Sequence, residues 1–475
     1  MHWIDYTIIF GYMVAVFGIG TFFLKKQTSV DEFFVGNRKM GWGHISFSVV
    51  ATDVGGGFSI GLGGLGYVMG LSGSWLLFTG LIGAWLSAVV LIPKVKRLGD
   101  AGKFLTFPDF LHSQFDERTR TMAALVSGIG YSGFVGGQVL AGGKLCSSAF
   151  GIGLVPAVLV MSTVIILYTS FGGLEAVVYT DTLQWVLLLV GLTFFALPFG
   201  YVEVGGWRSI RAALPPAYFS LTNVAPSQFL AWMFSIIPIW FVGMTLYQRI
   251  YATRDLKTAR RAWYVAGLLE WPLMSFLGVT LGMFSRVIYP HVDAEMGLPL
   301  LIRNVLPTGV VGIVMAAYFA AIMSTADSCL LAAAGNFTND IYQRYINPKA
   351  SEKRVLAVSR TLTVTIGFAS VALALLVPNV LEVILLSYAF MVSGLFVPTI
   401  AALTPWPTSS RGAVWSIIVG GSSAVLMQRG FILIPFNEPI FWSLPLAALF
   451  YLFFFFRDKN RRDREAINGL QVSTS

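Results

Sequence analysis

The sequence predicts an all-α polytopic membrane protein with about thirteen transmembrane helices, and three features of the chain support this. Of its 475 residues, 56% are hydrophobic and only 12% are charged, whereas soluble domains carry about 25% charge. The hydrophobic residues gather in runs, most of them close to the roughly 20 residues that a spanning helix needs. The basic residues also alternate between dense and sparse connections, as expected for a chain that crosses a bilayer repeatedly.

The apolar runs follow one another with short connections, so we expect a single transmembrane domain over residues 1–456. It has an extra helix at 4–24, core helices within 43–403 and two further helices within 412–456, and a polar cytoplasmic tail follows at 457–475. The thirteen predicted spans are 4–24, 43–69, 73–93, 121–143, 154–170, 176–200, 227–247, 262–285, 308–334, 357–377, 380–403, 412–427 and 437–456.

The positions of the basic residues predict the orientation. With the N-terminus outside and alternating spans, 26 of the 32 Lys and Arg residues fall on the inside, as the positive-inside rule requires. This favours an odd number of spans, N-out and C-in, in the plasma (inner) membrane. The net charge of +9 is spread over these loops rather than gathered on one face with aromatics, which argues against nucleic-acid binding. Cys146 and Cys329 form neither a metal spacing nor a disulfide framework.

The run from about residue 310 to 334 contains Ser324, Thr325, Asp327 and Ser328 near its middle. An Asp at the centre of a membrane helix costs about 2.5–3.5 kcal/mol on insertion scales. Hydroxyl and carboxylate oxygens are suitable ligands for a small hard cation. These polar residues within an apolar run therefore predict an ion site on this helix, as in a transporter.

The second span predicts a broken helix, because Asp53 is followed by Gly55, Gly56 and Gly57. Each Gly costs a helix about 1 kcal/mol relative to Ala, and an unwound segment frees carbonyls that can bind ions or solutes. The seventh span, five helices later, carries Pro238 and Gly243 as a second candidate break. Breaks at matching places predict a five-plus-five inverted repeat.

Four segments resemble the sodium/solute symporter family, which includes proline, sugar, sialic-acid and choline transporters. Asp31–Arg38 is similar to its D-x-F-x-x-G-R loop, and Ala51–Gly57 to its broken first core helix. Gly172–Gln184 resembles its G-G-L-x-A-V-x-x-T-D-x-x-Q signature, and Ala321–Ser328 its A-x-x-S-S/T ion-site helix. The resemblance covers nearly the whole chain and implies a LeuT-type fold.

The resemblance also implies a sodium ion between the first and eighth core helices. Its ligands would be the carbonyls of Ala51, Val54 and Ala321 and the hydroxyls of Ser324 and Thr325. Some family members hold another sodium beside this site. The matching positions for a second sodium are Asp181, Ser324, Asp327 and Ser328. Family members often have a hydroxyl where Asp327 stands, so this change either strengthens the second site or makes it a proton site.

Asp53 resembles an aspartate of proline-transporting relatives, and it stands where the choline branch has an aromatic residue. An acid at this place favours an amine or amino-acid solute. Structural alternatives stay open: Asp53 as a helix cap, Asp181 as a tie between helices, and the aromatic residues Phe58, Phe134, Trp240 and Tyr388 as lipid-facing bulk. The predicted solute site comprises Asp53, Gly55, Gly56, Gly57, Phe58, Phe134, Trp240 and Gly243.

We therefore expect a sodium-coupled symporter, not an enzyme, that works by alternating access. Its partners are a small solute, sodium and membrane lipid, and it is a monomer or weak oligomer. The alternatives are a symporter of sugars or carboxylates and a solute sensor of the same fold. An intramembrane aspartyl protease built on Asp181 and Asp327 is disfavoured, because no Gly-x-Gly-Asp element precedes Asp327. A passive channel fits poorly with a broken-helix site.

Overall fold

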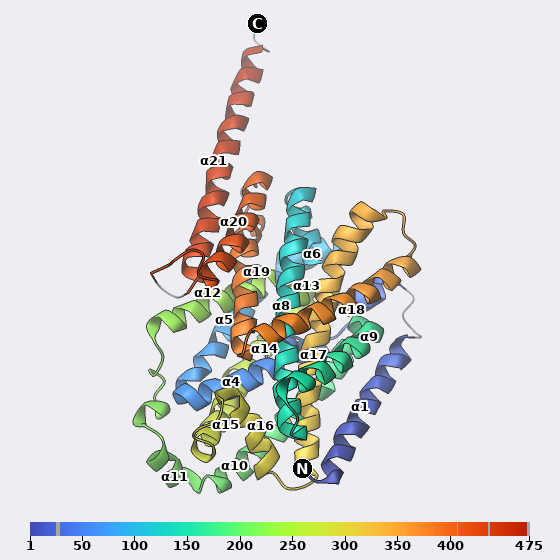
Figure 1. Cartoon of the computed structure of the whole chain (residues 1–475). Coiled ribbons are helices and arrows are strands. Elements are labelled where there is room, and N and C mark those ends of the chain that lie inside the picture. Colours follow the sequence, from blue (N-terminus) through green and yellow to red (C-terminus); the bar gives the residue numbers. More distant parts are fainter. Residues whose placement is uncertain (25–28, 406, 436–437, 473–475) are drawn as a thin grey trace.

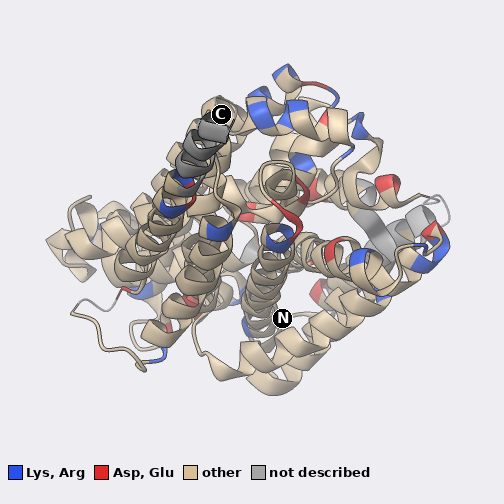
Figure 2. Ribbon diagram, turned by 90° about the horizontal axis from the view of Figure 1, so that it is seen from above, with Lys and Arg blue, Asp and Glu red and all other residues tan. Residues whose placement is uncertain are grey.

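The computed structural model of the chain describes residues 1–24, 29–405, 407–435 and 438–472. These residues are nearly all helical, and the two termini lie at opposite ends of the molecule (Figure 1). Seen from the end that carries the C-terminus, Lys and Arg lie mostly at helix ends and in connections (Figure 2).

The packing of the long helices divides the centre of the molecule into two units. Helices of the first unit, here called the bundle, pack on one another, and helices of the second, the scaffold, do the same. The bundle consists of α3 (Trp42–Asp53), α4 (Gly56–Met69), α5 (Trp75–Val90), α12 (Pro226–Val242), α13 (Met244–Ala252), α14 (Leu256–Leu268) and α15 (Ser275–Ile288). The scaffold consists of α8 (Glu117–Phe150), α9 (Leu154–Val190), α17 (Val310–Gly335) and α18 (Glu352–Leu376).

The remaining helices surround these units. Helix α1 (Trp3–Leu24) packs on α9 and α17, and α19 (Val380–Leu403) lies between α8 and α12. Helices α20 (Ser410–Gln428) and α21 (Ile440–Val472) pack on each other and on α19. The short helices are α2 (Val30–Val35), α6 (Ile92–Gly102), α7 (Phe107–His112), α10 (Leu197–Glu203), α11 (Gly206–Ala213) and α16 (Ala294–Val305). Short 3₁₀ or π segments are η1 (Gly36–Arg38), η2 (Gly70–Ser74), η3 (Gly191–Ala196), η4 (Pro216–Phe219), η5 (Leu269–Met274) and η6 (Asn336–Ile346).

Three bundle helices are interrupted, and two of the interruptions were predicted. Val54 and Gly55 separate α3 from α4, and α12 and α13 meet at Gly243 with a bend of 42°. The third lies in η5, where Trp271 leaves helical geometry (φ −133°, ψ 127°) just before Pro272. Proline lacks an N–H and clashes with the preceding turn, so the break between α14 and α15 has a local cause.

The number of spans stays a prediction. Within the described residues, eight helices are long and apolar enough to cross a membrane, and the bent pair α12 and α13 makes up to nine. The predicted spans 154–170 and 176–200 lie on one helical run, α9, that continues through η3 and α10, and the apolar stretches Leu154–Leu167 and Val177–Glu203 match them. Helix α21 continues beyond the predicted span end at 456 and reaches Val472 in the polar tail (Figure 1); side chains beyond residue 460 lie outside the described part.

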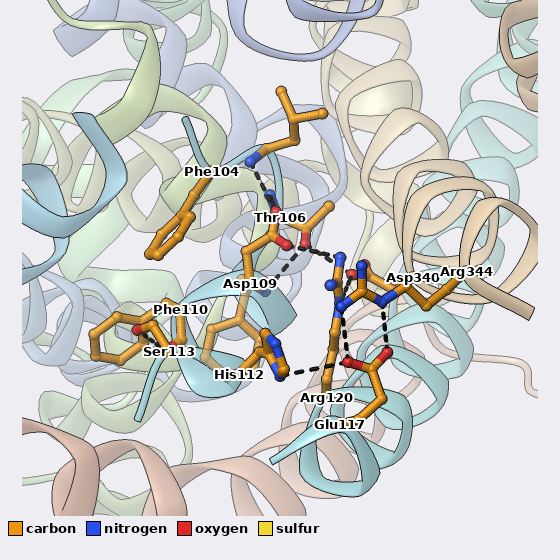
Figure 3. A network of polar contacts seen from close by, with 12 residues as sticks. Phe104, Thr106, Asp109, Phe110, His112, Ser113, Glu117, Arg120, Asp340 and Arg344 are labelled. Carbon is orange, nitrogen blue, oxygen red and sulfur yellow. Dashed lines mark hydrogen bonds and ion pairs between the residues drawn. The ribbon is translucent and has the colours of Figure 1, made fainter. Parts of the chain in front are cut away.

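A polar network joins α7, α8 and η6 at the predicted inner end (Figure 3). Arg120 contacts Asp109 and Asp340 at 2.7 Å each, and Asp340 is fully buried. Arg344 binds Glu117 through two nitrogens, at 2.8 and 3.1 Å, on the exposed side of the same network. These ion pairs therefore hold the predicted inner ends of α8 and α17 together.

Candidate functional site

The break between α3 and α4 lies directly against α17. Thr325 Oγ1 donates to the carbonyl oxygen of Ala51 at 2.8 Å and to that of Ala321 at 3.1 Å. Ser324 Oγ also donates to Ala321 O, at 3.0 Å. Four of the five predicted sodium ligands therefore meet in one hydrogen-bonded set. The fifth, the carbonyl of Val54, ends α3 one turn further on and accepts from Ser59 Oγ at 3.3 Å.

Gly55 allows this close approach. A Cβ atom at Gly55 would lie 1.5 Å from Thr325 Oγ1 and 2.7 Å from Ala51 O. Both distances are too short for non-bonded atoms, so no side chain fits at this position. The donor set consists of two hydroxyls and three carbonyls, all uncharged and all oxygen. These are the ligands that a small alkali cation takes in proteins, so the residues present fit the expected sodium ion.

The positions predicted for a second sodium lie on the inner side of the first set, and an arginine stands among them. Arg249 of α13 is completely buried. Its Nη2 donates to Ser328 Oγ and Thr52 Oγ1 at 2.7 Å each and contacts Asp181 Oδ2 at 3.3 Å. Its Nε donates to Ser48 Oγ at 2.9 Å. The guanidinium thus joins α13 to α3, α9 and α17.

Asp327 completes this cluster without a direct bond to Arg249. Both carboxylate oxygens of Asp327 and Oδ1 of Asp181 are buried and receive no hydrogen bond from any described residue. Two acids and one arginine leave one negative charge uncompensated if both acids are ionised. Such a charge inside a protein needs a partner, and a sodium ion or a proton would supply it.

Arg249 corrects the sequence analysis, which counted it among the basic residues of an inner loop. The guanidinium lies instead at the junction of four helices, with no exposed surface. The available signal was its place directly after the predicted break at Gly243. A charged residue that closely follows an interrupted span can point into the binding site between the helices as well as into the following loop.

A small cavity lies beside the first break. It has a volume of about 10 Å³, enough for about one water molecule, and its lining comes from six helices, α3, α8, α12, α13, α17 and α19. Tyr388 Oη donates to Asp53 Oδ1 at 3.1 Å. The aromatic rings of Phe58, Phe134 and Tyr388 lie 5.2–6.4 Å apart, centroid to centroid. The lining residues are Thr52, Asp53, Tyr131, Phe134, Ile239, Gly243, Thr245, Leu246, Cys329 and Tyr388.

The other predicted solute residues are not all at this cavity. Gly57 N donates to Gln138 Oε1 of α8 at 3.1 Å, so Gly57 ties the bundle to the scaffold. Gly56 begins α4, and its surroundings lie outside the described part. Trp240 is fully buried against Trp263, with ring centroids 6.5 Å apart, and does not line the cavity.

A wider cavity of about 510 Å³ leads toward the same place from the predicted outer end. Its walls come from α4, α12, α16 and α19 and from the facing ends of α20 and α21. Gly61, Ser235 and Ala389 line it; Gly61 and Ser235 lie about one turn from Phe58 and Ile239, and Ala389 follows Tyr388. The Arg249 contacts lie on the opposite, predicted inner side of this small cavity.

Interrupted helices that meet an unbroken helix over a set of oxygens define a secondary transporter of the LeuT-type fold. The sodium:solute symporter family matches residues 33–420, and the chain belongs to this family. This confirms the predicted resemblance and the predicted fold.

Curated relatives of known function are transporters rather than enzymes. The chain is 27% identical to the osmoregulated proline transporter OpuE of Bacillus subtilis, over 87% of each chain. It is 25% identical to the high-affinity proline transporter PutP of the same organism, over 86% of this chain and 89% of the relative. It is also 25% identical to sodium/glucose cotransporter 1 of Ovis aries, over 95% and 76%.

Solved structures agree on the fold. A Na⁺-coupled sialic acid symporter in a substrate-bound outward-open state superposes with a TM-score of 0.81 at 22% identity, covering 94% of this chain and 97% of that one. MHP1, a nucleobase-cation-symport-1 family transporter, gives a TM-score of 0.58 at 11% identity, over 88% and 92%.

Proposed function

We propose that the chain is a sodium-coupled symporter that imports a small amine or amino acid by alternating access across the plasma (inner) membrane. The observation that carries the proposal is the hydrogen bond from Thr325 in α17 to the free carbonyl of Ala51 in α3. It brings the broken helix of the bundle and the unbroken helix of the scaffold to one set of oxygens.

A sodium ion bound by Ala51, Val54, Ala321, Ser324 and Thr325 would join the bundle to the scaffold. This favours the arrangement in which these helices touch, and we propose that this arrangement faces outward. Each charge that moves inward through 100 mV contributes about 2.3 kcal/mol. That free energy can be used to concentrate the solute.

The second cation site at Asp181, Ser324, Asp327 and Ser328 remains part of the proposal. Arg249 already satisfies Asp181 Oδ2 and Ser328 Oγ, so Asp327 is the group that would hold the second cation. A proton satisfies a buried carboxylate with fewer ligands than sodium requires, and the alternative of a proton site at Asp327 is retained.

The solute class follows from Asp53. An acid beside three aromatic rings suits a cationic or zwitterionic amine, because ammonium groups pair with carboxylates and are attracted to aromatic faces. A carboxylate solute without an amine would meet repulsion from Asp53. A sugar would leave the charge of Asp53 unpaired, which is costly in a closed cavity.

Two measurements test the proposal together. Purified protein is screened for thermal stabilisation by amines, amino acids, sugars and carboxylates, with and without sodium, and the stabilising solutes are used for uptake into proteoliposomes. We expect an amine or amino acid to bind and to be taken up only with a sodium gradient. Ser324→Ala combined with Thr325→Ala should abolish sodium-stimulated uptake, and Asp53→Asn should weaken solute uptake.

The matched control is Ser46→Ala, which removes a fully buried hydroxyl of α3 that, among the described residues, donates to Gly43 O within its own helix. It should keep sodium-dependent uptake. Unchanged sodium dependence in the double variant would refute the site, and binding without uptake would favour the sensor alternative.

A further inference from the structure

A groove separate from the transport site lies between α19 and α21, toward the end of the molecule that carries the C-terminus (Figure 1). Its volume is about 710 Å³, within the range of about 300–1,000 Å³ that is usual for small-molecule sites. The two helices form its walls, and the connection that leads into α20 completes its lining. The mechanism proposed above uses none of these residues.

The groove is apolar along most of its length and polar at one end. The apolar lining includes Val397, Ile400, Tyr451, Leu452, Phe455 and Phe456. The polar lining residues Thr404, Asp458 and Lys459 come after these in the two helices. Ser409 Oγ, at the start of α20, donates to Asp458 Oδ2 at 2.6 Å, so the polar ends of the two walls lie together. A matching ligand has an apolar body and a polar head.

The groove opens on a surface that faces lipid. Leu452 and Phe456 in its lining are 46% and 55% exposed. Only 22% of the apolar window within the candidate span Ile440–Asn460 is buried inside the protein. Most of α21 therefore lies against the acyl chains of the bilayer, and such a chain can enter the groove sideways without passing through water.

The polar end of the groove carries positive charge. Asp458 already has partners, since its Oδ1 lies 3.8 Å from Nη1 of Arg411 and its Oδ2 accepts from Ser409. Among the described residues, no acid pairs with the exposed ammonium group of Lys459. The sequence at 457–464 contains five basic and two acidic residues. This end of the groove therefore attracts an anionic headgroup.

A second copy of the chain fits the groove less well than a lipid does. Two copies in one membrane have the same orientation, so an interface on α21 would bring their basic ends to the same depth. Like charges placed opposite each other repel, whereas an anionic headgroup would pair with them. Basic pockets between helices on the cytoplasmic side suit anionic lipid headgroups, and the distribution of Lys and Arg predicts that this end is cytoplasmic.

We infer that the groove binds an anionic phospholipid from the membrane leaflet on the C-terminal side. An acyl chain lies between the α19 wall and the aromatic rings of Tyr451 and Phe455, and the phosphate pairs with Lys459. The inference goes beyond the proposed transport and does not rest on it, because no residue of the ion or solute site takes part.

Native mass spectrometry of the full chain in detergent tests the headgroup. Delipidated protein is titrated with phosphatidylglycerol and phosphatidylcholine that carry the same acyl chains, and the bound lipid is quantified. We expect phosphatidylglycerol to bind more tightly. Lys459→Gln should lower its affinity about fivefold, the contribution of one basic residue near an anionic surface, and leave that of phosphatidylcholine unchanged. The matched control, Lys353→Gln, removes an exposed charge at the predicted inner end of α18, outside the groove, and should change neither.

A second pair of variants tests the apolar part of the groove. Ala448→Trp places an indole in the lining and should weaken the binding of both lipids. Leu449→Trp, at the next position on α21 and 64% exposed outside the groove, should weaken neither. Glycerol 3-phosphate, which has the headgroup phosphate without acyl chains, should not displace the bound lipid even in excess.

Three outcomes would overturn the inference. Equal affinities for the two lipids, or equal losses in Lys459→Gln and Lys353→Gln, would mean that the groove does not select a headgroup. Displacement by glycerol 3-phosphate would indicate a site for free phosphate. A dimer that Ala448→Trp converts to a monomer, with lipid binding unchanged, would show that a second copy covers the groove. If Ala448→Trp fails to fold, the comparison of Lys459→Gln with Lys353→Gln still decides the question.

Discussion

Gly55 and Thr325 set how closely α17 approaches the broken helix. Their contact is so tight that no side chain fits at Gly55, whereas Gly43, one residue inside the N-terminus of α3, has open space where a Cβ would stand. The same residue type thus has different roles on the same broken helix. At Gly55 it permits a ligand set to form, and at Gly43 it does not affect packing.

Gly55→Ala should therefore abolish sodium-dependent thermal stabilisation. The added methyl would occupy the position of Thr325 Oγ1, and relieving the overlap moves α17 away from Ala51 at a cost of about 1–3 kcal/mol in stability. The measurement is the melting temperature across a sodium titration, with Gly43→Ala as the control. A Gly55→Ala protein that responds to sodium as the wild type does would show that these oxygens do not bind the ion.

Ion pairs between helices stabilise the protein to different degrees, depending on whether they are buried or exposed. In the inner-end network, Arg120 keeps 9% of its side-chain surface exposed and contacts the fully buried Asp340, while Arg344 keeps 47% and contacts Glu117, itself 33% exposed. The first pair holds α8 to the end of α17 inside the protein. The second lies where water and salt screen it.

Arg120→Met should destabilise the protein by about 3–5 kcal/mol, because it leaves the buried Asp340 without its charged partner and with Thr106 Oγ1 as its remaining donor among the described residues. Arg344→Met, a change of the same kind in the same network, should cost at most about 1 kcal/mol. Denaturant-induced unfolding in detergent measures both. Equal losses in the two variants would mean that burial does not determine the strength of this network.

The sequence analysis predicted those features of the fold that residues close together in the chain indicate. Asp53 followed by three glycines and Gly243 after Pro238 indicated the first two breaks, and the hydroxyls of α17 indicated the ion-site helix. The sequence analysis missed the third break, although Pro272 after Glu270 gave the same kind of local mark.

Arg249 was placed in a loop because its bonds are made with residues up to 201 positions away in the chain. Charge counting uses position along the chain, so it cannot register a contact that only the packed helices create.

Several polar contacts join the bundle to the scaffold, and they include those of Arg249, Gly57 and Thr325. Arg249 closes the inner side by joining α13 to α9 and α17. The wide outer cavity ends at Ala389, next to Tyr388. Alternating access on this architecture requires the Arg249 contacts to separate while the walls of the outer cavity come together.

Labelling of a cysteine at Ala389 should report this motion and the orientation together. In a background without Cys146 and Cys329, both buried, Ala389→Cys should react with an impermeant maleimide added outside intact cells. It should react several-fold faster in sodium than in potassium, since sodium at the Ala51–Thr325 set favours the outward-facing state. Leu433→Cys, 92% exposed in the predicted outer connection between α20 and α21 and outside this cavity, should react equally in both salts, and Ser324→Ala with Thr325→Ala should remove the difference at Ala389. Slower labelling in sodium would show that the ion favours the inward-facing state, and labelling only after permeabilisation would reverse the orientation.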